Sequence, residues 1–254
     1  MKTFLSLLIG LIVHFSFAQD RYLQVDYIEK FGLNTSQGAM HYPTSLFIGL
    51  DSAQLYRVNT ADAQFIERSQ SADFTQLEFY TPSSKKYLDY YKDTKDSSVT
   101  YRWYIERSRV VVKDWPRFEW EHIDETKEVL GYTCKKAVLN FRGRKYTAYY
   151  TEELKAEGGP WKFSSLPGLI LEINSENGEF EINASAVTFL EREESLIINP
   201  YTEAEQISWS EYKKRYTEKY KEGKKPEEDM LTGMTTTISM PVRNRELMVE
   251  KKDQ

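Results

Sequence analysis

The 254-residue sequence carries 34 Lys and Arg against 39 Asp and Glu, a formal net charge of −5 at pH 7. General nucleic-acid binding depends on a basic face that neutralises phosphates, so this acidic balance argues against it. Cys134 is the only Cys, which excludes a disulfide within the chain, and the three His show no ligand spacing such as CxxC or HExxH. We therefore expect no metal and no cofactor.

The first 18 residues follow the three-part plan of a secretory signal peptide. Lys2 gives a positive start, an apolar run covers residues 4–15, and Ser16-Phe17-Ala18 forms a small-x-small cleavage site. We predict cleavage after Ala18. The apolar run is shorter than the roughly 20 residues of a membrane-spanning helix, and no later segment reaches that length without charges. We expect an exported protein, periplasmic or extracellular, without a transmembrane segment in the mature chain.

The body of the sequence alternates apolar and polar residues with the period of two that is typical of half-buried strands. Leu23, Val25 and Tyr27, for example, alternate with Gln24 and Asp26. Because no helical segments of ten or more residues separate these patterns, a parallel α/β sheet is not expected. We predict a mainly β fold, an antiparallel meander that forms a curved sheet or half-barrel. The predicted strands lie at 22–28, 45–50, 54–58, 75–80, 101–105, 110–112, 139–141, 146–150, 169–173 and 180–184.

One helix is predicted near the C-terminus, at about 202–222, where it closes the curved sheet. Trp209, Tyr212, Tyr216 and Tyr220 fall on one face of such a helix, while Lys and Arg residues cover much of the rest. The aromatic face either binds an anionic membrane surface or a partner, or packs across the sheet; we expect packing. The helix ends a single β-rich domain over 19–222, and a partly ordered tail follows over 223–254.

A Pro-Gly turn walled by bulky apolar residues is the most unusual local pattern. The sequence Leu166-Pro167-Gly168-Leu169 matches a type II turn, in which Pro takes the second position and Gly accepts a positive φ at the third. We read it as a corner that feeds the next strand. Its apolar walls predict burial, or contact with a ligand or partner. The candidate ligand- or partner-binding residues are Trp161, Phe163, Leu166, Pro167, Gly168 and Leu169.

At this corner the sequence resembles a known family. The stretch SLPGLILEI, preceded by GPWKF, is similar to the signature of the GLPGLI family of exported proteins from Bacteroidetes, and the likeness runs upstream through GYTCKKA and an aromatic YT strand. It is close over about Trp115 to Ile182. Ser165 stands where the family hexapeptide has its first Gly, which costs little if the local φ is negative. The resemblance implies an exported β-rich fold and no particular activity.

Several reactive or charged residues have a structural interpretation that we prefer. Cys134 is expected to be a small core residue and His122 a surface residue. The basic cluster Arg142-Gly143-Arg144-Lys145 predicts a hairpin tip with solvated cations, although it would also suit phosphate groups of lipopolysaccharide.

Three functions remain open. The surplus of aromatic residues and the one-sided strands suggest a curved sheet that shelters an apolar ligand such as a lipid. Alternatively, an exposed edge or the aromatic corner docks on an outer-membrane protein. A hydrolase with a carboxylate pair is the third, but the sequence lacks a GxSxG elbow and a phosphate-binding glycine loop, which favours binding over catalysis. Its candidate carboxylates are Glu119, Glu121, Asp124, Glu125, Glu152, Glu153, Glu193 and Glu194.

Overall fold

The computed structural model describes residues 21–32, 38–49, 53–67, 87–106, 108–191, 197–223, 227–228 and 235–236. The predicted signal peptide and the predicted strand at 75–80 lie outside these residues, and so does most of the predicted tail. Within the described part, no helix combines the length and the apolar character needed to cross a membrane.

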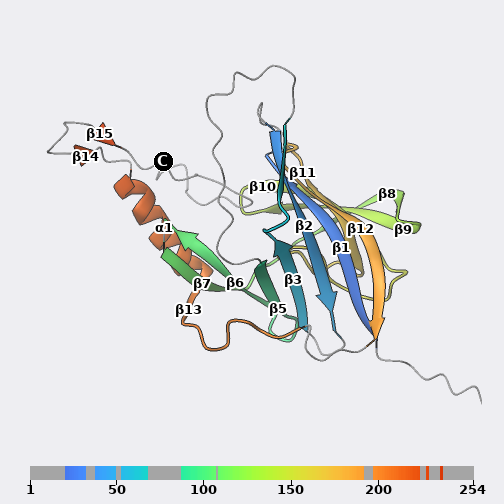
Figure 1. Ribbon diagram of the computed structural model, residues 1–254. Coiled ribbons are helices and arrows are strands. Elements are labelled where there is room, and N and C mark those ends of the chain that lie inside the picture. The colour runs from blue at the N-terminus through green and yellow to red at the C-terminus, as the bar shows by residue number, and fades with distance from the viewer. Residues whose placement is uncertain are drawn as a thin grey trace, which may run out of the picture.

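Thirteen strands form one curved sheet, and the single described helix lies beside one end of it (Figure 1). The prediction of a mainly β fold with one helix near the C-terminus is therefore confirmed. All pairings in this sheet are antiparallel except that of β13 with β7. The strands of the sheet are β1 (Arg21–Phe31), β2 (Gly38–Ile48), β3 (Ala53–Asn59), β4 (Gln64–Glu67), β5 (Tyr87–Asp93), β6 (Ser98–Ile105), β7 (Ser108–Asp114), β8 (Glu121–Val129), β9 (Tyr132–Phe141), β10 (Arg144–Thr151), β11 (Leu169–Ser175), β12 (Phe180–Glu191) and β13 (Gln206–Ser208).

The first strand lies in the middle of the sheet, whose order is β13-β7-β6-β5-β3-β2-β1-β12-β11-β10-β9-β8, with β4 paired to β2. β1 pairs with β2 on one side and with β12 on the other. As the alternation predicts, Leu23, Val25 and Tyr27 are buried. A separate pair of two-residue strands, β14 (Glu227–Glu228) and β15 (Thr235–Thr236), follows the helix.

A row of tyrosine rings crosses the inner face of the sheet and accounts for part of the Tyr surplus. Tyr27, Tyr56, Tyr90 and Tyr101 come from β1, β3, β5 and β6, and successive ring centroids lie 6.4, 6.1 and 5.2 Å apart. All four rings are buried. Edge-to-face and offset arrangements at such distances are favourable for aromatic pairs. The inner face of the curved sheet is thus filled by its own side chains.

The helix α1 (Trp209–Gly223) begins later than the predicted residue 202. Residues 201–203 form a turn, and 206–208 pair with β7 as the edge strand β13. Ser208 then caps the helix, because its Oγ accepts a hydrogen bond from the backbone N–H of Glu211 at 3.2 Å. Tyr212, Tyr216 and Tyr220 are buried against the sheet, as predicted for the aromatic face.

Candidate functional site

The predicted corner is a packed part of the core. Trp161, Phe163, Leu166 and Leu169 are each at most 2% exposed. The rings of Trp161 and Phe163 meet edge to face with their centroids 5.1 Å apart, and Tyr146 contacts Phe163 at 5.0 Å. Gly168 is buried as well, so of the six candidate binding residues only Pro167 is exposed. The structure therefore places the apolar walls of the corner in contact with the chain itself.

The turn at the corner differs from the predicted type II turn. The backbone N–H of Gly168 bonds to the carbonyl of Leu166 at 2.8 Å, which makes a three-residue turn centred on Pro167. Gly168 does not have a positive φ, whereas Ser165 has φ +68°. The glycine is needed for space instead, since a Cβ there would lie 2.3 Å from the carbonyl oxygen of Thr151. Because the φ of Ser165 is positive, the condition under which Ser would cost little at this position is not met.

Two polar side chains from the sheet hold the loop that carries the corner, residues 154–168. Lys92 Nζ donates hydrogen bonds to the carbonyls of Gly159, at 2.5 Å, and Phe163, at 3.0 Å. Gln54 Nε2 donates to the carbonyl of Glu157 at 2.7 Å. Lys92 is 3% exposed, and this burial lowers its pKa to about 7. Both side chains thus fasten carbonyls of the loop to the neighbouring strands β3 and β5.

A second anchor is the buried cluster of Lys162, Asp114 and Arg142. Lys162 Nζ lies 3.1 Å from Asp114 Oδ2 and also donates to the hydroxyl of Tyr101 at 2.9 Å. Arg142 binds the same carboxylate through two hydrogen bonds of 2.7 and 2.8 Å. Burial raises the pKa of Asp114, but the charges of Lys162 and Arg142 outweigh burial and hold this pKa below its usual range. The rings of Tyr101, Trp209 and Trp161 surround the Lys162 ammonium at 4.3, 4.6 and 5.1 Å.

The basic hairpin tip is thus more than a set of solvated cations. Arg142 and Gly143, with φ +45° and +80°, form a two-residue turn between β9 and β10, where a hairpin tip was predicted. Arg144 is 7% exposed and donates to Glu179 Oε2 at 2.8 Å and to Asn177 Oδ1 at 3.1 Å. The expectation of solvated cations is wrong for Arg142 and Arg144, because both form ion pairs with neighbouring segments.

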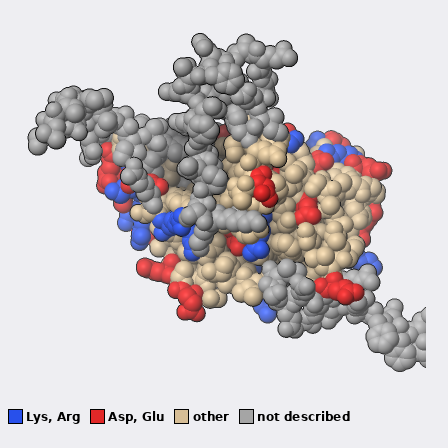
Figure 2. Space-filling view, viewed as in Figure 1, with Lys and Arg blue, Asp and Glu red and all other residues tan. Residues whose placement is uncertain are grey.

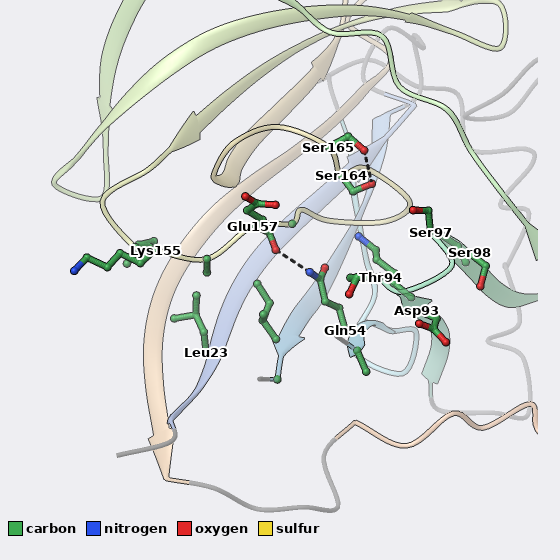
Figure 3. A pocket seen from close by; sticks show the side chains of 18 of the residues that line it. Leu23, Gln54, Asp93, Thr94, Ser97, Ser98, Lys155, Glu157, Ser164 and Ser165 are labelled. Carbon is green, nitrogen blue, oxygen red and sulfur yellow. Dashed lines mark hydrogen bonds between the residues drawn. The ribbon is translucent and has the colours of Figure 1, made fainter. Parts of the chain in front are cut away.

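Beside the loop lies a cleft of about 820 Å³. It is bounded by the loop, by the turn between β5 and β6, and by the ends of β1, β2, β3 and β12. Figure 3 shows the hydrogen bond between Gln54 and Glu157, with Thr94 beside Gln54, Ser164 and Ser165 above, and Ser97 and Ser98 to the right. Volumes of about 300–1,000 Å³ are typical of sites for small molecules.

The lining of this cleft combines hydroxyl groups with apolar side chains. Five hydroxyls come from Thr94, Ser97, Ser98, Ser164 and Ser165. The apolar residues are Leu23, Ile48, Ala53, Val99, Leu154, Ala156 and Phe189, of which Phe189 is 52% exposed. The charged residues include acids and lysines, Asp93, Glu157, Lys92 and Lys155, so neither sign dominates. Such a lining suits a ligand with both an apolar and a hydrogen-bonding part, and not a highly charged one.

Sequence reasoning missed the polar residues of the cleft. Lys92 follows Leu88 and Tyr90 at intervals of two in β5, and this row faces the interior. The alternation was therefore a signal for a buried Lys. Residues 94–98 have the composition of an ordinary polar turn. A short segment does not indicate which loop its hydroxyl groups face.

The other residues considered at the sequence level lie elsewhere. Cys134 is buried, as predicted, and burial raises the pKa of its thiol to about 11. His122 is exposed, as predicted, and its Nδ1 lies 3.1 Å from the Tyr150 hydroxyl. Among the described residues, no group of three or more His, Cys, Asp or Glu is arranged to hold a metal ion.

The candidate carboxylates for hydrolysis line the surface at β8 and after β10. All six that are described are exposed, and Glu193 and Glu194 lie outside the described residues. Glu125 pairs with Lys136 at 2.7 Å, and Glu152 pairs with Lys135 at 2.8 Å. None of the six lines the cleft. The six described carboxylates therefore lie on the surface, away from the candidate site.

Comparison with known proteins gives a match to a family model and similarity to solved structures. Residues 93–214 match the family described as the N-glycanase peptide, N-terminal domain. Crystal structures of PNGF-II in space groups C2 and P21 are similar to the chain with TM-scores of 0.45 and identities of 18% and 20%. Each covers 79% of this chain, which spans 33% and 34% of theirs, about a third of their length. No curated protein sequence matches the chain.

Proposed function

We propose that the protein is an exported binding protein without catalytic activity, which holds an apolar ligand with a polar end, such as a lipid, in the cleft beside the loop 154–168. The observation that carries this proposal is the two-sided lining of the cleft. Ile48, Ala156 and Phe189 offer an apolar surface, and the hydroxyls of Ser97 and Ser164 offer hydrogen bonds. The sequence suggested that the inner face of the curved sheet shelters the ligand. Because tyrosine rings fill that face, we place the ligand in the cleft instead.

The walls of the cleft are fixed before a ligand arrives, which supports a binding role. Lys92 and Gln54 tie three loop carbonyls to the sheet, and the Gly158 N–H bonds to the Gly168 carbonyl at 3.3 Å. A preformed site avoids the entropy cost of ordering a loop on binding. We expect the loop to keep its position with and without ligand.

Native and denaturing mass spectra of protein purified gently from its own cells test the proposal. An added small mass that is released on denaturation is the expected result. The substitution Ala156→Trp fills the cleft and should abolish this mass, because Ala156 is a half-buried lining residue. Ala61→Trp, at an exposed turn outside the cleft, is the matched control. Equal retention of the ligand by both variants would show that the ligand does not bind in the cleft.

A glycan is the second candidate ligand. Five hydroxyls in the lining and the exposed ring of Phe189 suit a sugar, whose faces stack on aromatic rings while its hydroxyls bond to polar groups. The similarity of residues 93–214 to the N-terminal domain of an N-glycanase agrees with this chemistry. The identity of the released mass separates the two candidates, since a lipid and an oligosaccharide fragment differently.

Docking on an outer-membrane protein is the alternative function. The aromatic corner is buried, so the docking surface would instead use exposed apolar residues, of which Ile198 is 62% exposed and Trp115 51% exposed. In that case the native mass spectrum contains a second polypeptide. Ile198→Glu should then remove the partner while Ala156→Trp leaves it bound, the reverse of the pattern for a ligand in the cleft.

A hydrolase with a carboxylate pair is the third candidate. Asp93 and Glu157 are the acids that line the cleft, and they come from the end of β5 and from the loop. Turnover of glycans, esters or peptides that disappears in both Asp93→Asn and Glu157→Gln would support it. A bare monomer without turnover would count against all three functions.

We also propose that the chain belongs to the GLPGLI family and enters the periplasm or the medium after cleavage behind Ala18. The support is the hexapeptide-like sequence at 165–170 and the three-part N-terminal segment. The N-terminal sequence of the exported protein should begin at Gln19. An N-terminus at Met1 in the cell fractions that hold the protein would contradict export by this route.

A further inference from the structure

The strand register arranges part of the lining of the cleft in one row across the sheet. Residues that lie directly opposite each other in antiparallel strands share a face. A continuous set of such pairs crosses β12, β1, β2, β3, β5 and β6 on the inner face. In this strand order, the residues of the row are Phe189, Leu23, Ile48, Gln54, Lys92 and Val99. All of them line the cleft, so the row gives the cleft a direction across the strands.

The two ends of the cleft differ in polarity. At the β12 end lies Phe189, whose ring is 52% exposed. At the other end, beyond Gln54 in β3, the turn between β5 and β6 carries the exposed residues Thr94 and Ser97. Figure 3 shows the same order, with Leu23 on one side of Gln54 and Thr94 on the other. A long ligand that lies along the row therefore meets an apolar end and a polar end.

Gln54, in the middle of the row, has one hydrogen-bonding atom without a partner. Its Nε2 donates to the carbonyl of Glu157 at 2.7 Å, which fixes the orientation of the amide. The Oε1 of the same amide is buried, and no described residue donates a hydrogen bond to it. A buried acceptor that lacks a donor is unfavourable. Because an amide oxygen only accepts hydrogen bonds, the ligand group that satisfies it must be a donor, as a hydroxyl is.

The charges around the polar end disfavour an anionic ligand. Asp93 and Glu157 are the acids of the lining. Lys92 donates to two carbonyls of the loop, and burial lowers its pKa to about 7, so most of this amine is uncharged at pH 8. Lys155 is exposed, and solvent screens its charge. The face in view in Figure 2 likewise mixes Lys and Arg with Asp and Glu, so neither sign forms a large patch there.

We propose that the ligand of the cleft is a long-chain compound with an uncharged head that donates hydrogen bonds, as a monoacylglycerol does. Its chain lies at the β12 end against Phe189, and its head lies at Gln54 and the turn between β5 and β6. There a head hydroxyl donates to Gln54 Oε1, and Thr94 and Ser97 offer further hydroxyls. The inference rests on the proposed function, since it assigns the direction and the head group of the ligand in the same cleft.

Calorimetric titration at pH 8 with three compounds that share one chain, each below its critical micelle concentration, tests the head group. Monolauroylglycerol has donor hydroxyls, methyl laurate has an uncharged head without a donor, and laurate has a charged head. We expect monolauroylglycerol to bind about tenfold more tightly than the other two, the effect of one hydrogen bond.

The outcomes separate this inference from the proposed function. Methyl laurate or laurate binding as tightly as monolauroylglycerol would overturn the inference and leave the cleft as a site for apolar ligands. Absence of binding of all three compounds would overturn it as well, and the native mass spectra would then decide the proposed function independently.

Two variants test the direction of the ligand. Gln54→Met keeps the length of the side chain and removes the acceptor, so it should weaken monolauroylglycerol about tenfold and leave methyl laurate nearly unchanged. Phe189→Glu, at an exposed position, should weaken both compounds equally, which keeps the test available if Gln54→Met disturbs folding. Leu130→Glu is its matched control, because Leu130 is 45% exposed and lies outside the lining. An unchanged preference in Gln54→Met, or equal effects of Phe189→Glu and Leu130→Glu, would contradict the assigned direction.

Discussion

The ammonium of Lys162 lies 3.1 Å from the carboxylate of Asp114, and both side chains are at most 2% exposed. The pair connects the end of β7 to the loop that forms the aromatic corner. Arg142, at the tip of the β9–β10 hairpin, binds the same carboxylate. One buried acid therefore joins three segments that are separate in the sequence.

We expect Asp114→Ala to be strongly destabilising, because it removes the carboxylate that balances the buried charge of Lys162. Removal of one partner from a buried pair costs about 3–5 kcal/mol in free energy of unfolding. Urea unfolding followed by tryptophan fluorescence measures the loss. Glu152→Ala is the control, since it breaks an exposed pair with Lys135 and should cost less than about 1 kcal/mol. Similar losses of unfolding free energy in both variants would mean that the buried pair contributes no more to stability than the exposed pair.

Lys92 should make stability rise with pH. Its pKa is about 7 in the folded protein and roughly 10.4 in the unfolded chain. Between these values the unfolded chain binds more protons, so folding gains up to about 1.4 kcal/mol per pH unit as the pH rises. Below pH 7 the lysine is charged in both states, and the contribution is constant.

The measurement is the free energy of unfolding at pH 7, 8 and 9 for the wild type and Lys92→Met. The free energy of unfolding of the wild type minus that of Lys92→Met should increase with each pH unit, since every other titrating group is common to both proteins. Parallel pH curves would show that Lys92 titrates normally in the fold.

Gly168→Ala tests the close approach at the corner. The added Cβ would lie 2.3 Å from the Thr151 carbonyl oxygen, and backbone cannot rotate away as a side chain can. We expect a loss of about 3 kcal/mol, at the upper end of the cost of overpacking. Gly131→Ala is the comparison, because nothing lies within 4 Å of its Cβ position and only its φ of +83° opposes the change. A smaller thermal shift for Gly168→Ala than for Gly131→Ala would contradict this reading.

Ser165→Gly should stabilise the protein. Ser165 has φ +68°, a conformation that costs an L-residue about 1 kcal/mol or more and glycine very little. We expect an increase of about 1 kcal/mol in the free energy of unfolding, measured by thermal and urea unfolding. Ser164→Gly, at a neighbouring residue without a positive φ, should instead be neutral or destabilising. A loss of stability in Ser165→Gly would show that the hydroxyl matters more than the strain.

The sequence predicted what depends on local periodicity. The period of two located β1, β3, β6 and β11, and the aromatic spacing of four identified the buried face of α1. The sheet order could not be predicted, because β1 and β12 pair residues that are 149 to 170 positions apart in the sequence. The alternation of a strand is the same whichever strand lies beside it.

The candidate site was harder to predict, for related reasons. The Pro-Gly pair suggested a type II turn, but the need for glycine arises from Thr151, which is distant in sequence. Arg144 was expected in solvent, yet Glu179 on another hairpin neutralises it in the interior. The cleft is made from five separate parts of the chain, and no short motif indicates that they meet.

The central position of β1 sets the order in which the fold can be completed. Strands β2, β3 and β5–β7 form one run of neighbours, strands β8–β12 form another, and β1 is the seam between them. Each run can collapse as soon as it is synthesised, but the seam is sealed only when residues 180–191 arrive to pair with β1. Until then one edge of β1 is open to other chains, so a delay before β12 emerges favours aggregation.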